Sequence, residues 1–110
     1  MLGANLPQNF PVIDRFVKGV ATSIKTLDLN AATYQNIGAL TSKVQGYINT
    51  LANFQGAHLG EFRITADQIS GRVLELVIPP GATQAQLAAL QQLQQYAVNL
   101  GVTLNIVVVP

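Results

Sequence analysis

Hydrophobic and polar positions first alternate along the chain with the period of a β-strand. Residues 11–17 and 20–27 are rich in Val, Ile, Phe and Thr, which is typical of extended strands. Lys18 and Gly19 separate the two runs, and glycine readily adopts the positive φ that a tight hairpin turn needs. The pattern therefore predicts a β-hairpin that turns at these two residues.

Apolar residues then recur every three or four positions, which predicts an amphipathic helix. We expect it to begin near Leu29, with Asp28 or Asn30 as its N-cap, and to end near Gly56. Its apolar positions are Tyr34, Ile37, Leu40, Val44, Tyr47, Ile48, Leu51 and Phe54. The aromatic residues among them could line a ligand cleft, but at this spacing they are expected to be core. Lys43 falls on the polar face of this helix.

The second half of the chain predicts apolar strands joined by a helix. A short strand is expected over 61–64, longer ones over 72–78 and 102–109, and a helix capped by Thr83 over 84–100. The six glutamines of this helix are expected to form a solvated face. Strands joined through one helix run parallel, with a right-handed crossover. The expected order is β-β-α-(β)-β-α-β, an α/β fold with a small mixed sheet and flanking helices.

The hairpin brings three chemically complementary side chains to one face. With a two-residue turn, Asp14 lies opposite Ser23, and strand alternation puts Lys25 on the same face and Arg15 and Thr22 on the other. A carboxylate can hold a divalent metal, a hydroxyl can complete its shell, and a lysine can orient water and neutralise charge on a phosphate. A slip of one residue would separate Asp14 from the other two. The alternative interpretation is a cross-strand ion pair of Asp14 and Lys25 on a solvated sheet face.

Two further titratable residues could have a chemical role. The single histidine, His58, falls in an expected loop over residues 55–60, where it could be a general base or a metal ligand, but no second ligand lies at strand or helix spacing. Glu75 interrupts an apolar strand and could be a metal or water ligand. Because an unpaired buried carboxylate is costly, we instead expect Glu75 to face outward, paired with Arg72 or Arg63.

Composition narrows the class of protein. A chain of 110 residues forms one small domain. Hydrophobic residues make up 49% and charged residues 10%, below the usual quarter or so, which indicates buried strands or a surface covered by a partner. The net charge of +1 lacks the basic stripe of a typical nucleic-acid-binding domain, so contact with DNA would use a few placed cations.

Several classes of site are excluded by absent residues or motifs. The chain has no cysteine, so it has neither disulfides nor thiolate metal sites. The N-terminus lacks the features of a signal peptide, and no apolar run is long enough to span a membrane. A Gly-rich phosphate loop, HExxH and G-x-S-x-G are all absent.

Three stretches carry a resemblance to a known family: ANLPQNFPVIDRFVKGVATSIKTLDL, SGRVLELVIPPGATQAQ and YAVNLGVTLNIVVV. They resemble the C-terminal nuclease domains of bacterial contact-dependent growth inhibition (CDI) toxins, in the branch similar to type IIS restriction endonucleases of the PD-(D/E)xK superfamily. In that family an aspartate on the first hairpin strand and a Ser-x-Lys on the second belong to the active site. These residues fall on Asp14 and on Ser23-Ile24-Lys25.

The resemblance implies a metal-dependent endonuclease that cleaves DNA, with zinc or magnesium as its divalent metal. Asp14 and Ser23 would bind the metal, and Lys25 would position the attacking water or stabilise charge on the phosphate. The family also uses a glutamate on a helix ahead of the hairpin, whereas residues 1–10 contain no acid. We therefore expect residues 1–110 to be a single toxin nuclease domain, with a PD-(D/E)xK-like core that lacks its first helix through N-terminal truncation.

The resemblance also implies partners and a route of delivery. It implies a cognate immunity protein, delivery from the C-terminus of a large secreted cell-surface protein, and action in the cytoplasm of a competing target cell. Sister toxins on this fold cleave transfer RNA, which is the alternative substrate. A non-catalytic module that binds a partner by strand addition is the alternative from another class. Without the glutamate, we expect the 110 residues to be nearly inactive alone, with possible self-association.

Overall fold

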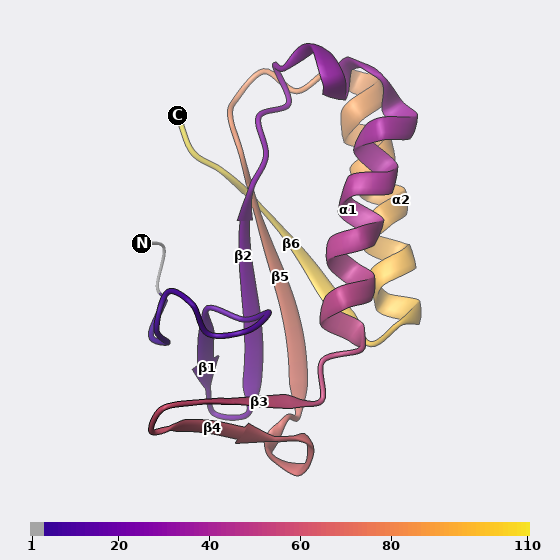
Figure 1. Cartoon of the computed structure of the whole chain (residues 1–110). Helices are drawn as coiled ribbons and strands as arrows, with labels where there is room; N and C mark the ends of the chain where they lie inside the picture. The colour runs from indigo at the N-terminus through magenta and orange to yellow at the C-terminus, as the bar shows by residue number, and fades with distance from the viewer. Residues whose placement is uncertain (1–3) are drawn as a thin grey trace.

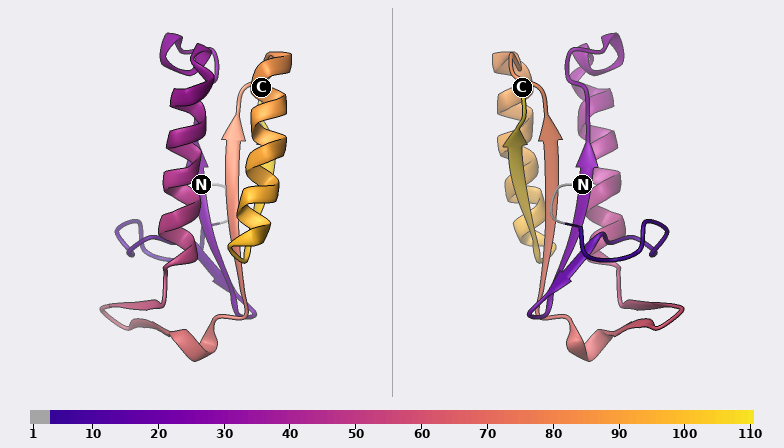
Figure 2. Two further views of the ribbon diagram at one scale, coloured as in Figure 1. Left: turned by 90° about the vertical axis from the view of Figure 1, so that its right-hand side faces the viewer. Right: turned by 90° about the vertical axis from the view of Figure 1, so that its left-hand side faces the viewer.

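The computed structural model describes residues 4–110 and contains a mixed sheet with two helices packed on one of its faces (Figures 1 and 2). The predicted α/β class is confirmed. Short 3₁₀ turns lie at Ala32–Gln35 and Ala66–Gln68. In chain order the main elements are β1 (Arg15–Val17), β2 (Val20–Thr26), α1 (Ile37–Ala52), β3 (Gly56–Leu59), β4 (Phe62–Thr65), β5 (Gly71–Ile78), α2 (Gln84–Asn99) and β6 (Val102–Val108).

The main sheet has the strand order β1-β2-β5-β6. β1 pairs antiparallel with β2, whereas β2, β5 and β6 run parallel. An antiparallel hairpin thus joins parallel strands, as the sequence pattern predicts. β3 and β4 form a separate antiparallel pair that lies at one end of the main sheet (Figure 1).

The turn between β1 and β2 has the predicted two-residue length, with Val17 opposite Val20 and Arg15 opposite Thr22. Lys18 and Gly19 have φ angles of 51° and 81°, as a type I′ hairpin turn requires. Gly19 is also closely approached, because a Cβ there would come within 2.5 Å of the Ser70 hydroxyl oxygen. Glycine at this position therefore serves both the turn and its packing against the start of β5.

Three local predictions are wrong. The first strand is expected over 11–17, but β1 covers only Arg15–Val17. The first helix begins at Ile37 and is capped by the Asn36 side chain, which accepts the Ala39 N–H, and not by Asp28 or Asn30. The Asp28 carboxylate instead accepts the Asn30 N–H, a local hydrogen bond that competes with a helix start. The expected loop over 55–60 contains β3, which pairs with β4.

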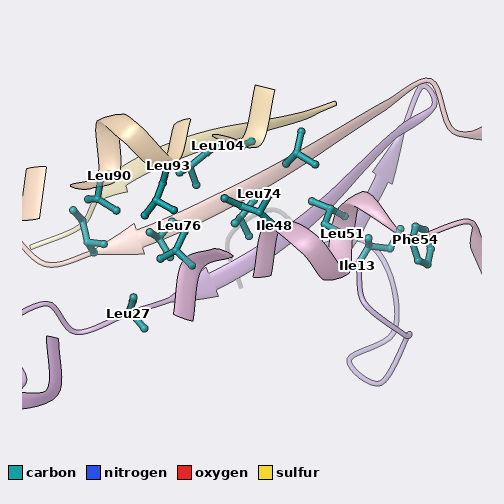
Figure 3. Packing of buried hydrophobic residues seen from close by; sticks show 14 of the residues in the cluster. Ile13, Leu27, Ile48, Leu51, Phe54, Leu74, Leu76, Leu90, Leu93 and Leu104 are labelled. Carbon is teal, nitrogen blue, oxygen red and sulfur yellow. The ribbon is translucent and has the colours of Figure 1, made fainter. Parts of the chain in front are cut away.

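The core lies between the main sheet and the two helices (Figure 3). The central strand β5 contributes Leu74 and Leu76, both 0% exposed. Residues from every layer meet them, including Ile13, Leu27, Ile48, Leu51, Phe54, Leu90, Leu93 and Leu104. Phe54 is buried as predicted, whereas Tyr34 and Tyr47 are only partly buried against the core.

Large apolar side chains remain exposed mainly on the side of α2 and β6. They include Leu87, Val98, Leu100 and Val108. The low charge content is thus reflected in uncovered apolar surface as well as in a buried core. Among residues 4–110, neither helix has the length and apolarity needed to cross a membrane.

Gln86 departs from the expected solvated face of α2, because it is 1% exposed. Its Nε2 donates to the carbonyls of Leu29 and Tyr34 at 2.8 and 2.9 Å. Its Oε1 accepts the Thr83 N–H at 2.9 Å, within the capping box that begins α2. One buried amide therefore ties the start of α2 to the segment between β2 and α1.

We expect Gln86→Ala to lower the free energy of unfolding by about 1–3 kcal/mol, because it leaves the Leu29 and Tyr34 carbonyls without this donor. Urea denaturation measures the change. Gln91→Ala, on the exposed face of the same helix, is the control and should stay within about 0.5 kcal/mol of the unaltered chain. Equal effects of the two substitutions would show that the buried amide contributes nothing specific.

Candidate active site

Ser23 and Lys25 lie on the face of the sheet that the helices cover. The parallel register pairs Ser23 with Leu74 and Lys25 with Leu76, two leucines of the core. Ser23 is 3% exposed, so its side chain is buried between the sheet and the helices. Arg15 and Thr22 lie on the opposite face, as predicted.

The hydrogen bonds between Asp14 and β2 differ from those that regular strand pairing predicts. The β1–β2 ladder ends at Arg15, and the Asp14 N–H donates to the Thr22 carbonyl at 2.8 Å. The Asp14 carboxylate then accepts the N–H of Ile24 at 2.8 Å through Oδ2. Since that N–H belongs to the peptide between Ser23 and Ile24, the hydrogen bond fixes the carboxylate beside the Ser-x-Lys segment.

A tight turn directly ahead of Asp14 produces this approach. The Ile13 N–H donates to the Pro11 carbonyl at 2.7 Å, which closes a γ-turn about Val12. Val12 has a φ of 67°, a strained conformation for a β-branched residue. The buried Ile13 side chain, 1% exposed, anchors the turn in the core. The strained backbone at Val12 therefore lies next to the Asp14 carboxylate, and the burial of Ile13 offsets the energetic cost of that strain.

The ammonium group of Lys25 lies against helix α1. Its Nζ is 5.4 Å from the centroid of the Tyr47 ring, and the Nζ of Lys43 is 5.5 Å from the same centroid. Within residues 4–110, no carboxylate lies within 4 Å of either ammonium. The alternative of an Asp14–Lys25 ion pair on a solvated face is therefore wrong in both its pairing and its face.

Glu75 and His58 have other neighbours. Glu75 faces outward as expected, but its ion-pair partner is Arg15, and not Arg72 or Arg63. Arg15 on β1 reaches Glu75 on β5 across the intervening strand β2. Arg72 instead donates to the Phe54 carbonyl at 2.6 Å. The His58 Nε2 lies 2.8 Å from the Gly60 carbonyl oxygen, in the β3–β4 hairpin.

The donors available for a metal at this site are oxygens. Asp14 supplies a carboxylate and Ser23 a hydroxyl, and the Ile24 hydrogen bond holds the carboxylate beside the strand segment that carries Ser23. In the described part of the chain, no group of three or more His, Cys, Asp or Glu residues is placed to hold a metal. This donor set suits a hard divalent cation that completes its shell with water and substrate phosphate.

Residues 1–107 match the family described as CDI toxin restriction endonuclease-like domain. The chain belongs to this family. The predicted membership of the CDI toxin nuclease family is thereby confirmed. Ser23 and Lys25, the two residues of the Ser-x-Lys motif, lie on the helix-covered face of the sheet.

Two named relatives and one solved structure are similar to this CDI toxin domain. It is 30% identical over 106 residues to "Deoxyribonuclease CdiA-o11" of Escherichia coli O157:H7 (strain EC869), an alignment that covers 94% of this chain and 28% of the relative. It is 28% identical over 108 residues to "Deoxyribonuclease CdiA" of Yersinia pseudotuberculosis serotype O:3 (strain YPIII), covering 96% of this chain and 10% of the relative. The chain therefore spans only a minor part of each relative.

The solved structure is a "CdiA-CT/CdiI toxin and immunity complex" from Yersinia pseudotuberculosis. It superposes on this CDI toxin domain with a TM-score of 0.82 at 24% identity, covering all of this chain and 91% of the other. At this identity the likeness establishes the fold, which agrees with the small mixed sheet and two helices of Figure 1.

Two residues near the site of the CDI toxin domain were not identified from sequence. The sequence predicts Tyr47 in the core and Lys43 on the polar helix face, yet Tyr47 lies beside Lys25 and Lys43 lies beside the same ring. Their spacing of four residues on one helix puts them on neighbouring turns, which indicated their mutual contact. Nothing local indicated that β2 would bring Lys25 to the same ring.

Proposed function

We propose that this CDI toxin domain is a metal-dependent endonuclease that hydrolyses phosphodiester bonds in DNA. The observation that carries the proposal is the Asp14 carboxylate held on the Ile24 N–H, directly beside the segment that presents Ser23 and Lys25. Two relatives that bear the name deoxyribonuclease support DNA as the substrate class.

In the proposed reaction, a water oxygen bonds to phosphorus while the bond from phosphorus to the leaving oxygen breaks. The products are a phosphate monoester and a free hydroxyl. A divalent metal at this site would polarise the phosphate and favour deprotonation of water. Lys25 contributes a fixed positive charge that orients the attacking water and offsets the negative charge developing on the phosphate.

Asp14 and Ser23 are the proposed metal ligands. Because Asp14 Oδ2 accepts the Ile24 N–H, coordination would fall chiefly to its other oxygen. Magnesium is commonly held by one or two carboxylates together with water and substrate phosphates, whereas zinc usually takes at least three protein ligands. Of the two metals that the resemblance implies, the donor set therefore favours magnesium.

The biological setting belongs to the same proposal. The small share of each relative that the chain matches supports a toxin domain carried by a much larger CdiA-type protein. Action in the cytoplasm of the target cell belongs to the proposal because a DNA-cleaving toxin has to reach its substrate there. The toxin and immunity complex named for the structural neighbour supports a cognate immunity protein as the partner.

The test is a side-by-side digestion of supercoiled plasmid DNA and total transfer RNA by the 110-residue chain. With a single carboxylate ligand, we expect weak metal binding, and hence slow plasmid cleavage that requires a high concentration of magnesium. A chelator should abolish cleavage and added magnesium should restore it, while zinc should support less. Cleavage of transfer RNA with intact plasmid would refute the DNA assignment, and cleavage that resists the chelator would refute the metal.

A further inference from the structure

Two ammonium groups from different elements share one aromatic ring. Lys25 comes from β2, whereas Lys43 and Tyr47 lie one turn apart on α1. The distances from the two Nζ atoms to the ring centroid, 5.4 and 5.5 Å, together place these nitrogens no more than about 11 Å apart. Both distances are within the range of a cation–π interaction, which is about 6 Å.

Neither ammonium has an ion-pair partner among residues 4–110. No carboxylate of residues 4–110 lies within 4 Å of either ammonium. Two positive charges therefore lie around one ring, and one of them belongs to the Ser-x-Lys segment that the proposed reaction uses. Such a pair is complementary to a polyanion, since one DNA strand carries a negative charge about every 3.4 Å along the helix axis.

Few other cations are available to contact DNA. The chain has six lysines and arginines. Arg15 pairs with Glu75, and Arg72 donates to the Phe54 carbonyl, so the guanidinium groups of both are engaged inside the domain. Lys18 lies at the β1–β2 turn and Arg63 on β4, at the end of the main sheet where the β3–β4 pair lies (Figure 1). Any phosphate contact made by Lys25 or Lys43 would therefore be a large share of the total.

We propose that Lys43 binds a DNA phosphate that flanks the scissile one, and that Tyr47 is a positioning residue that holds the Lys25 ammonium at the reacting phosphate. This inference rests on the proposed nuclease function. It makes the exposed side of α1 part of the substrate interface. Lys43 contributes binding, whereas Tyr47 acts on the chemical step through Lys25.

The Lys43 contact is tested by the salt dependence of DNA binding. Fluorescence anisotropy of a labelled duplex, recorded with chelator present so that it is not cleaved, gives the affinity at several salt concentrations. Loss of one phosphate contact should make the slope of log K against log salt shallower by about 0.9. We expect this for Lys43→Gln and no change for Arg63→Gln, the charge-matched control on β4. At DNA concentrations well below saturation, Lys43→Gln should cleave more slowly than the unaltered chain, in proportion to its weaker binding.

The positioning role of Tyr47 is tested by two substitutions. Tyr47→Phe keeps the aromatic ring over the ammonium groups, so its kcat should stay close to that of the unaltered chain. Tyr47→Leu keeps an apolar side chain but removes the ring, and should lower kcat about 3- to 30-fold with little change in affinity. Circular dichroism and thermal unfolding of both variants report whether the fold is retained.

The outcomes separate this inference from the function on which it rests. Failure of the unaltered chain to cleave DNA at any magnesium concentration, even over long incubation, overturns both. Intact cleavage with an unchanged salt slope in Lys43→Gln overturns the phosphate contact alone. A defect in Tyr47→Phe equal to that in Tyr47→Leu, in a folded protein, overturns the positioning role, because the ring would then be irrelevant.

Discussion

Lys25→Ala should lower the rate of DNA cleavage by about 100- to 1,000-fold at saturating magnesium and substrate, the usual effect of removing one charge that stabilises a transition state. The fold should persist, because the lysine tip lies against the Tyr47 ring and the core beside it is filled by Leu74 and Leu76 of the adjacent strand β5. Single-turnover cleavage measures the rate, and circular dichroism verifies the fold.

The control for Lys25→Ala has to remove a cation that lies away from the site. Arg63→Ala, on the exposed surface of β4, meets this condition, whereas Lys43 does not, because its ammonium shares the Tyr47 ring. Full activity in Lys25→Ala would refute the proposed mechanism. The same loss in Arg63→Ala would show that the effect comes from overall charge.

Asp14→Asn should abolish metal-dependent cleavage, again by about 100-fold or more, while leaving stability almost unchanged. The asparagine carbonyl can still accept the Ile24 N–H, so the approach of residue 14 to β2 is retained while the anionic metal ligand is lost. Asp14→Ala removes both functions and should also lower the free energy of unfolding by about 1 kcal/mol. Cleavage assays over a magnesium series and thermal unfolding separate the two effects.

Asp28→Asn is the matched control for Asp14→Asn. Its carboxylate also accepts a backbone N–H, that of Asn30, and it lies on an exposed loop beyond the end of β2. We expect this variant to cleave DNA at the rate of the unaltered chain. Activity of Asp14→Asn that recovers fully at high magnesium would mean that the carboxylate sets only the affinity for the metal. Activity unchanged at every concentration would remove Asp14 from the site.

The features that the sequence predicted correctly depend on local geometry. Lys18 and Gly19 determine a two-residue turn by their positive φ, and the turn determines the register of the hairpin. The register in turn places Ser23 and Lys25 on one face and Arg15 on the other. The positions of α2 and β6 follow equally from apolar periodicity and from the capping box at Thr83.

The placement of Asp14 required the tertiary structure. Regular strand alternation predicts that Asp14 pairs with Ser23. In the structure the strand pairing ends at Arg15, and after the γ-turn at Val12 the Asp14 carboxylate accepts the Ile24 N–H. That turn is strained, and the burial of Ile13 offsets the strain. Propensity at Val12 favours an extended strand, and no local signal opposes it.

Contacts between elements distant in the chain were also decided only by packing. Arg15 and Glu75 are 60 residues apart, and Gln86 and Leu29 are 57 apart, so neither pair follows from spacing along one strand or helix. The contact of Lys25 with Tyr47 is of the same kind, because it exists only once α1 packs over β2. The sequence by itself thus determined which side chains share a strand face, through the period of the backbone. Which helix residues meet that face depended on the crossing of α1 over the sheet, which is set by the whole core.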